Sequence, residues 1–182
     1  MTTHAVLILN DVRATDVGAL NRSVVSGSDA DDIDNGNVFF LDSVGTSSSA
    51  LEVWTAEIPV TGSLIGLWMA ASPEVNTTVD GSYQYRGLNQ DPRNFYNIGG
   101  KVFDAVKLVE GDVITLTSDA LDSSTEAAFA NATTAVYTFA WSATVAAAAM
   151  CLRYLATTYI SIGSGAIDSQ RVEAYKFEVL NN

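Results

Sequence analysis

The segment KVFDAVKLVEGDVITLT, residues 101–117, is the strongest indication of the fold. Residues 101–108 can alternate between the two faces of a half-buried strand. Glu110 and Gly111 then mark a tight turn, and residues 113–117 are rich in the β-branched side chains that favour strands. Two such runs joined by a short turn that contains glycine predict a β-hairpin.

Short runs of the same kind continue on both sides of this segment. Each run is apolar or alternating, and the runs are separated by residues that favour turns, such as the Asn35-Gly36 pair. Besides the two strands above, we expect strands at residues 38–41, 51–56, 64–70, 136–141, 150–162 and 171–180. About eight short strands with frequent turns predict an all-β fold, either a barrel or a sandwich.

The N-terminal stretch, residues 1–34, differs in composition from the rest of the chain. Between Asp11 and Asp34 there is almost no large apolar residue and no clean period, and the stretch carries six aspartates. Such a stretch has too few apolar side chains to fold alone. We therefore expect residues 1–34 to be an extended N-terminal arm that lies on a partner, and residues 35–182 to be a single β-rich domain.

The composition argues against several classes of protein. The chain has 9 Lys+Arg against 21 Asp+Glu, a formal net charge of −12, which repels phosphates, so we expect no nucleic acid partner. One cysteine (Cys151) and one histidine (His4) are too few for a Cys/His zinc site or an internal disulfide. The longest apolar stretch, residues 143–155, is broken by Arg153 and is shorter than a membrane span, so we expect no membrane partner. The first ten residues have no basic region and only a short apolar run, so we expect no targeting segment and synthesis in the cytoplasm.

The densest group of carboxylates, in residues 28–36, does not match a calcium-binding loop. A calcium loop with its glycine at Gly36 would place ligands at Asp31, Ile33 and Asn35, and an isoleucine side chain cannot bind a cation. The sequence therefore predicts a solvated acidic loop ahead of a hairpin, and no metal site; the alternative is a weak cation site.

Other patterns that carry chemistry are also incomplete. The turn at residues 99–101 lacks the spacing of a phosphate-binding loop. Nothing in the sequence brings two carboxylates face to face for acid–base work; the candidates are Glu52, Glu57, Asp104 and Asp112. We expect no catalytic residue and no cofactor.

Four residues in a polar stretch are the candidates for contact with a partner. Residues 74–94 have little apolar content, and they contain two tyrosines and two arginines, types that are enriched in the cores of interfaces. The candidate contact residues are Tyr83, Tyr85, Arg86 and Arg93.

Two groups of motifs resemble those of a known family. The first is Asn35-Gly36-x-Val38 with the strand that runs from Glu52 to Pro59, and the second is FYN-x-GGKVFDA at residues 95–105 followed by KLVEGDVITL at residues 107–116. In these segments the chain resembles the auxiliary head proteins of tailed bacteriophages, also called decoration or cement proteins. The resemblance covers most of the chain from about Asn35 to the C-terminus.

The resemblance implies a structural protein without enzymatic activity or cofactor. It implies a β-rich protein that is made in the cytoplasm of the host bacterium and sits on the exterior of the capsid in the virion. Its expected partner is the major capsid protein, since such proteins bridge neighbouring capsid subunits and stabilise the shell against the pressure of the genome. It also implies a homo-oligomer, with a trimer favoured.

Two other functions compete with this one. A carbohydrate-binding or adhesion module on the virion surface would need two or three exposed aromatic side chains on one face; the candidates include Trp54, Trp68 and Trp141. A hydrolase would need a cleft with two facing carboxylates.

Overall fold

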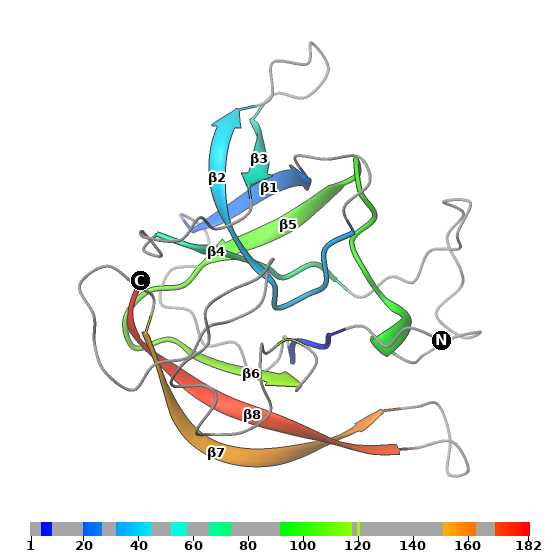
Figure 1. The fold of residues 1–182 in the computed structure, drawn as a ribbon, viewed down its shortest axis with the longest axis vertical. Coiled ribbons are helices and arrows are strands. Elements are labelled where there is room, and N and C mark those ends of the chain that lie inside the picture. The colour runs from blue at the N-terminus through cyan, green and yellow to red at the C-terminus, as the bar shows by residue number, and fades with distance from the viewer. Residues whose placement is uncertain are drawn as a thin grey trace.

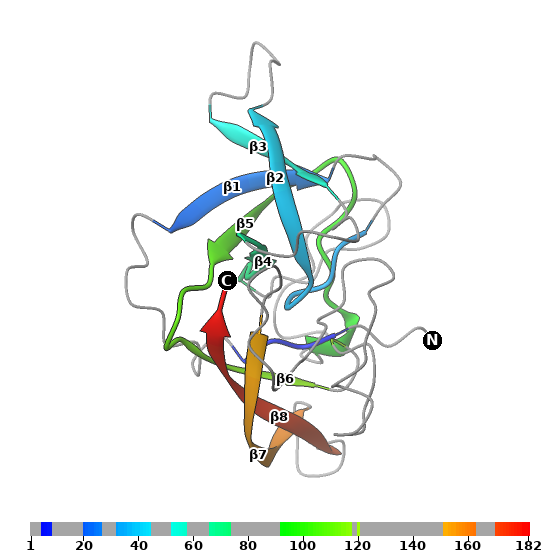
Figure 2. The same ribbon diagram turned by 60° about the vertical axis from the view of Figure 1, so that its left-hand side comes forward.

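The eight strands among the described residues form two β-structures that lie one above the other (Figure 1). We describe the fold from a computed structural model, in which the described residues are 5–8, 20–26, 32–44, 52–57, 66–73, 92–117, 120, 151–162 and 170–182. Turning the molecule by 60° keeps the five-stranded part above the three-stranded part, with the C-terminus between them (Figure 2).

The upper part is a closed barrel. Its strands are β1 (Asn21–Ser26), β2 (Val38–Val44), β3 (Val53–Glu57), β4 (Trp68–Ala70) and β5 (Val102–Lys107). The order is β1-β3-β2-β4-β5, and β1 closes the barrel by pairing antiparallel with β5. The pair β1–β3 is parallel, and the other pairs are antiparallel. Each described strand of this part therefore has a neighbour on both sides, as closure of a barrel requires.

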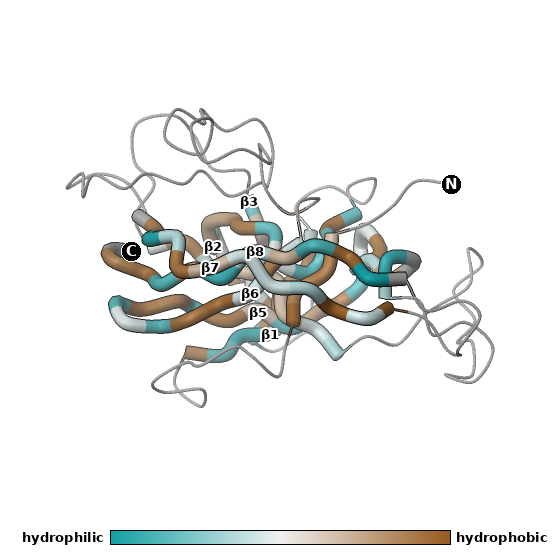
Figure 3. Tube along the Cα trace, turned by 90° about the horizontal axis from the view of Figure 1, so that it is seen from below, coloured by the Kyte–Doolittle hydropathy of each residue, from teal (hydrophilic) through white to brown (hydrophobic). Residues whose placement is uncertain are grey.

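The lower part is a three-stranded antiparallel sheet. It contains β6 (Val113–Thr117), β7 (Cys151–Ile162) and β8 (Gln170–Asn181) in the order β6-β8-β7. The N-terminal residues 5–8 lie along β6, where Ile8 N–H donates to the Thr115 carbonyl and Thr117 N–H donates to the Val6 carbonyl, both at 3.1 Å. Hydrophobic and hydrophilic residues follow one another along the strands, as the tube coloured by hydropathy shows (Figure 3).

The all-β class predicted from the sequence is confirmed. Strands β2, β3, β7 and β8 lie where alternating or β-branched runs predicted them, within a few residues at each end. Strand β4 is shorter than expected and begins at Trp68 instead of Leu64. The strand expected at residues 136–141 lies outside the described residues.

The hairpin predicted at residues 101–117 is wrong. Strand β5 pairs with β1 and β4 inside the barrel, whereas β6 pairs with β8 in the other sheet. The turn between them is bound to β8: Gly111 N–H donates to the Val179 carbonyl, and Val179 N–H donates to the Asp112 carbonyl, both at 2.9 Å. The turn therefore directs the chain from one sheet into the other.

The expectation that residues 1–34 lie outside the core is also wrong, as far as these residues are described. Strand β1 fills the position between β3 and β5, and its Val24 is fully buried. Leu7 and Ile33 are buried as well. The few apolar side chains of this stretch suffice because each one enters a core that other strands supply, so the stretch needs no core of its own.

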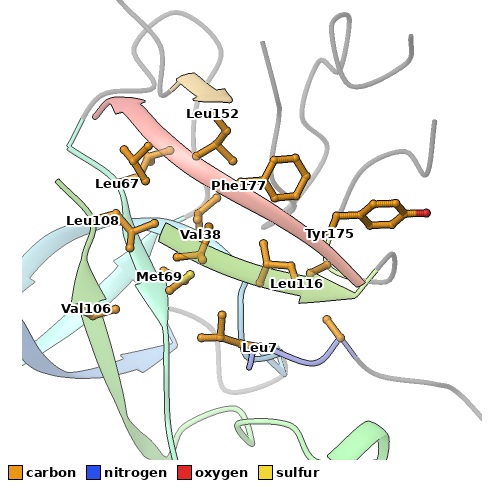
Figure 4. Close-up of a cluster of buried hydrophobic side chains, with 14 residues drawn as sticks. Leu7, Val38, Leu67, Met69, Val106, Leu108, Leu116, Leu152, Tyr175 and Phe177 are labelled. Carbon is orange, nitrogen blue, oxygen red and sulfur yellow. The ribbon is translucent and has the colours of Figure 1, made fainter. Parts of the chain in front are cut away.

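Two clusters of buried side chains hold the structure together. One fills the barrel and includes Val24, Phe39 and Phe103; the rings of Phe39 and Phe103 meet edge to face, with their centres 5.7 Å apart. The other lies between the barrel and the sheet. There, side chains of the barrel strands and of β6, β7 and β8 converge (Figure 4); its labelled members are Leu7, Val38, Leu67, Met69, Val106, Leu108, Leu116, Leu152, Tyr175 and Phe177.

Gly36 shows why the predicted Asn35-Gly36 turn needs glycine. Its φ is +93°, and a Cβ atom on it would lie 2.8 Å from Cδ2 of Leu116. We expect Gly36→Ala to lower the free energy of unfolding by about 1–2 kcal/mol, because alanine is strained at positive φ and the methyl group would press on Leu116. Urea unfolding measures the change. Gly111→Ala is the matched control, since Gly111 has a φ of +91° but open space around its Cβ position. If the free energy of unfolding falls by the same amount in the two variants, the contact with Leu116 has no steric role.

Candidate interaction surface

Of the four predicted contact residues, one is described. Tyr83, Tyr85 and Arg86 lie outside the described residues. Arg93 lies in the single-turn 3-10 helix η2 (Pro92–Asn94), where it is half-buried. The chain after η2 is fixed to the segment before β2 by the reciprocal pair Ile33–Asn97, with N–H to carbonyl distances of 2.9 and 2.8 Å. Arg93 therefore lies on a well-anchored segment, and its role as a contact residue stays a prediction.

The acidic segment before β2 uses its described carboxylates to hold neighbouring backbone. Asp34 accepts a hydrogen bond from Ala5 N–H at 3.0 Å, and Asp32 accepts one from Gly99 N–H at 3.0 Å. Between them Ile33 is fully buried. Among the described residues no group of three His, Cys, Asp or Glu side chains is placed to hold a metal ion.

The buried polar side chains next to this segment form a structural network. The Asn35 side chain donates to the Ser72 carbonyl at 2.8 Å and accepts from Ser72 N–H at 3.0 Å. Asn97 donates to the Ile33 carbonyl at 2.8 Å and to Asn35 Oδ1 at 3.3 Å. These side-chain amides form hydrogen bonds with backbone groups that have no partner in the strand pairing, because buried polar groups generally need a hydrogen-bond partner. The network therefore locks the turn before β2 to the end of β4.

A third side-chain amide, that of Asn182, joins the barrel to the lower sheet. Its Oδ1 accepts from Gly66 N–H at 3.1 Å and from Leu67 N–H at 2.9 Å. Its Nδ2 donates to the Leu67 carbonyl at 2.9 Å and to the Leu108 carbonyl at 2.7 Å. One side chain at the end of β8 thus binds the segment that enters β4 and the segment that leaves β5.

The four carboxylates considered for acid–base work lie at separate points of the fold. Glu52 precedes β3 and Glu57 ends it, while Asp104 is on β5. Asp112 is fully buried in the turn after β5 and accepts a hydrogen bond from Val109 N–H at 2.9 Å. Asp112 therefore shapes the turn that leads from the barrel into the lower sheet.

The half-buried tryptophans of the barrel belong to its core. Trp54 and Trp68 pack against the cluster that contains Val24 and Phe103. The guanidinium of Arg22 lies 5.7 Å from the centre of the Trp68 ring, within the range of a cation–π contact. Trp141 lies outside the described residues.

Large apolar side chains are exposed at two places in the described structure. On the barrel these are Val44, 42% exposed, and Val102, 57% exposed. On β7 they are Leu155, 43% exposed, and Tyr159, 50% exposed. The guanidinium of Arg171 on β8 lies 4.2 Å from the centre of the Tyr159 ring and holds this side chain in place.

The face of β8 beside Tyr159 changes from core to solvent along the strand. Phe177 and Tyr175 are buried, whereas Glu173 and Arg171, two and four residues further out, are exposed. Burial, together with a 3.1 Å hydrogen bond from the Tyr175 hydroxyl to Glu173, raises the pKa of Tyr175 above its ordinary value. On this face the outer half of the β7–β8 pair therefore extends beyond the core, and it presents side chains on strands that the inner half fixes.

Sequence reasoning missed this surface. It predicted strands at residues 150–162 and 171–180, but alternation alone does not tell where along a strand the core ends. The signal that was present is the uncharged, β-branched run from Thr157 to Ile160, which is as typical of a buried strand as of an exposed one.

No helix among the described residues is long and apolar enough to cross a membrane. Comparison of the chain with protein-family models, with curated proteins and with solved structures finds no match.

Proposed function

We propose that the protein is a structural component of the exterior of a tailed-phage capsid, where it binds neighbouring major capsid proteins and stabilises the shell. In this proposal the protein works as a homo-oligomer, with a trimer favoured, and it acts by binding alone. Its strong negative charge suits a position outside a shell filled with DNA, since acidic surfaces repel phosphates.

The observation that carries the proposal is the position in the fold of the motifs that resemble those of decoration proteins. Residues 95–116 contain the stronger of these motifs, and they run from the Ile33–Asn97 pair through β5 and the Gly111 turn into β6. This is the connection that joins the barrel to the lower sheet. Motifs at such positions support a resemblance in fold, which is the kind of likeness expected of a binding protein without an active site.

The described polar side chains add indirect support. Three carboxylates accept hydrogen bonds from backbone N–H groups, namely those of Asp32, Asp34 and Asp112. Three side-chain amides donate hydrogen bonds to backbone carbonyls, namely those of Asn35, Asn97 and Asn182. These side chains stabilise turns and connections. A rigid β-framework built in this way suits a protein whose task is to hold its neighbours in place.

The predicted contact residues give the test of this function. We expect the double variant Tyr85→Ala with Arg86→Ala to weaken binding to capsids that lack the protein by about 1–3 kcal/mol, because tyrosine and arginine are frequent anchors of interfaces. Co-sedimentation of the purified protein with such capsids measures the affinity. If arginines dominate the contact, binding should also weaken as salt rises, since the Debye length falls from about 10 Å at 0.1 M to about 3 Å at 1 M.

The matched control removes the same two residue types from a described surface. Tyr159→Ala with Arg171→Ala takes away the exposed cation–π pair of the lower sheet. Loss of binding in this control alone would place the capsid contact, or an oligomer contact on which capsid binding depends, on β7 and β8 instead of on residues 83–93. Failure of the unaltered protein to bind any capsid, combined with binding to a glycan array, would replace the proposal with the carbohydrate-binding function.

A further inference from the structure

Strand β7 is a long strand at the edge of the lower sheet. It has 12 residues, which corresponds to about 40 Å at 3.3 Å per residue, whereas an average strand has about 5–6 residues. One edge of β7 pairs with β8 along its length, and within the described part of the chain no strand pairs with the other edge. In Figure 1 it is the outermost strand of the lower sheet.

The outer half of β7 is open to solvent along one face. Thr157, Tyr159 and Ser161 alternate along this face, and all three are exposed. The other face runs from the exposed Ala156 through half-buried residues to the buried Ile162. Within the described part of the chain this strand is held by one neighbour, so its free edge can accept a second strand.

This half of β7 also lacks the features that normally keep an edge strand from pairing. Such features are charged side chains, prolines and bulges. The register shifts of β7 lie at residues 151–152 and 154–156, and its one charged residue, Arg153, forms an ion pair with Glu178. From Ala156 to Ile162 the strand has regular pairing, no charge and no proline, and five of its seven residues are β-branched or aromatic. Short uncharged segments of high β-propensity are the ones that pair with copies of themselves.

The distribution of charge indicates which partner fits this edge. Two copies of a chain with a net charge of −12 repel each other over most of their surface. Strands β7 and β8 together carry three basic residues against two acidic ones, and β7 has no acidic residue; the five are Arg153, Arg171, Lys176, Glu173 and Glu178. Strand β7 itself therefore brings no carboxylate to the edge where two copies would meet, and Glu173, which pairs with Tyr159, lies one strand further in.

We propose that β7 pairs antiparallel with β7 of a second copy of this chain, about a two-fold axis close to Tyr159. Tyr159 is the middle residue of the regular segment Ala156–Ile162, so the full segment is paired when the axis lies there. The two sheets then join into one continuous sheet of six strands, since each copy contributes three. The cation–π contact with Arg171 fixes the Tyr159 side chain before association, which lowers the entropy lost on pairing. This self-association does not depend on the capsid function proposed above, and its two-fold dimer is an alternative to the trimer favoured there.

The test introduces a charge at residue 159, which in the proposed dimer faces residue 159 of the second copy across the axis. Sedimentation equilibrium of the unaltered protein should show a mass that rises with concentration from the 19.3 kDa of one chain to twice that value. Tyr159→Lys and Tyr159→Glu should each weaken dimer formation by about tenfold or more, because like charges directly opposite on paired strands repel. An equimolar mixture of the two variants should restore the dimer, since opposite charges then face each other.

Val102 is the matched control site. It is the most exposed of the large apolar side chains on the described part of the barrel, and Val102→Lys and Val102→Glu should leave the dimer unchanged. Circular dichroism checks that every variant keeps its strand content. The proposal is overturned if the unaltered protein keeps the mass of one chain at all concentrations. It is also overturned if the protein forms an oligomer whose mass is unchanged in both Tyr159 variants, as a trimer formed through another surface would be.

Discussion

Replacing Val24 by aspartate is expected to lower the free energy of unfolding by about 3–5 kcal/mol, because an unpaired buried charge is costly. Val24 is fully buried inside the barrel, opposite Phe103 on β5 and Trp54 on β3. A carboxylate at this position has no cation to pair with among these neighbours. Domains of this size are stable by about 5–15 kcal/mol, so the substitution removes a large part of the total. Urea unfolding followed by tryptophan fluorescence measures it.

The neighbouring residue gives a control in the same strand. Val25 points to the other face of β1, where it is half-buried opposite the exposed Val102. We expect Val25→Asp to cost no more than about 1 kcal/mol, since surface substitutions are usually small in effect. If both variants unfold at the same urea concentration as the unaltered protein, β1 does not belong to the cooperative unit, and residues 1–34 behave as the arm that the composition of the stretch suggests.

The comparison of β1 with β8 shows which parts of the fold the sequence can predict. Strand β8 alternates in sequence, and from Tyr175 to Leu180 its burial follows that alternation, with Tyr175, Phe177 and Val179 on the buried side. Strand β1 has only two apolar residues, Val24 and Val25, among polar ones. Its place in the barrel is decided by β3 and β5, the strands on either side of it, which are distant from it along the chain. A local pattern cannot carry that information.

The failure of the hairpin at residues 101–117 has a similar cause. Both strands and the turn at Gly111 were predicted from the sequence, and all three exist. What the local pattern could not show is that β8, which a long stretch of chain separates from β6, competes for the edge of β6 and binds the turn through Val179. Pairing between strands that are near in sequence is common, but long-range pairing prevails where it buries more apolar surface.

The candidate surface was harder to predict than the fold. Tyr159 and Leu155 are ordinary strand residues in the sequence, and their exposure depends on where the cluster around Phe177 ends. The structural role of Asn182 had no sequence signal at all, because its partners at Gly66, Leu67 and Leu108 are brought to it only by the packing of the two sheets.

Asn182 is the subject of the second large expected effect. We expect Asn182→Asp to lower the free energy of unfolding by about 2–4 kcal/mol, because it places a charged acceptor against other acceptors. The new carboxylate has nearly the same shape as the amide and can still accept from Gly66 and Leu67 N–H, but its second oxygen would face the carbonyls of Leu67 and Leu108 in place of a donor. The two carbonyls are repelled by the charged oxygen, and they are left unsatisfied at a partly buried site.

A comparison of two substitutions separates this repulsion from the simple loss of hydrogen bonds. Asn182→Ala removes all four bonds without adding a charge and leaves space for water, so we expect it to cost less than Asn182→Asp, about 1–2 kcal/mol. Amide hydrogen exchange adds a local measurement: in both variants the Gly66 and Leu67 amides should exchange faster, because their acceptor is altered or missing. If the aspartate variant is as stable as the unaltered protein, the amide of Asn182 does not join the barrel to the lower sheet, and the buried cluster between the two parts, with Leu67, Leu108 and Phe177, holds them together alone.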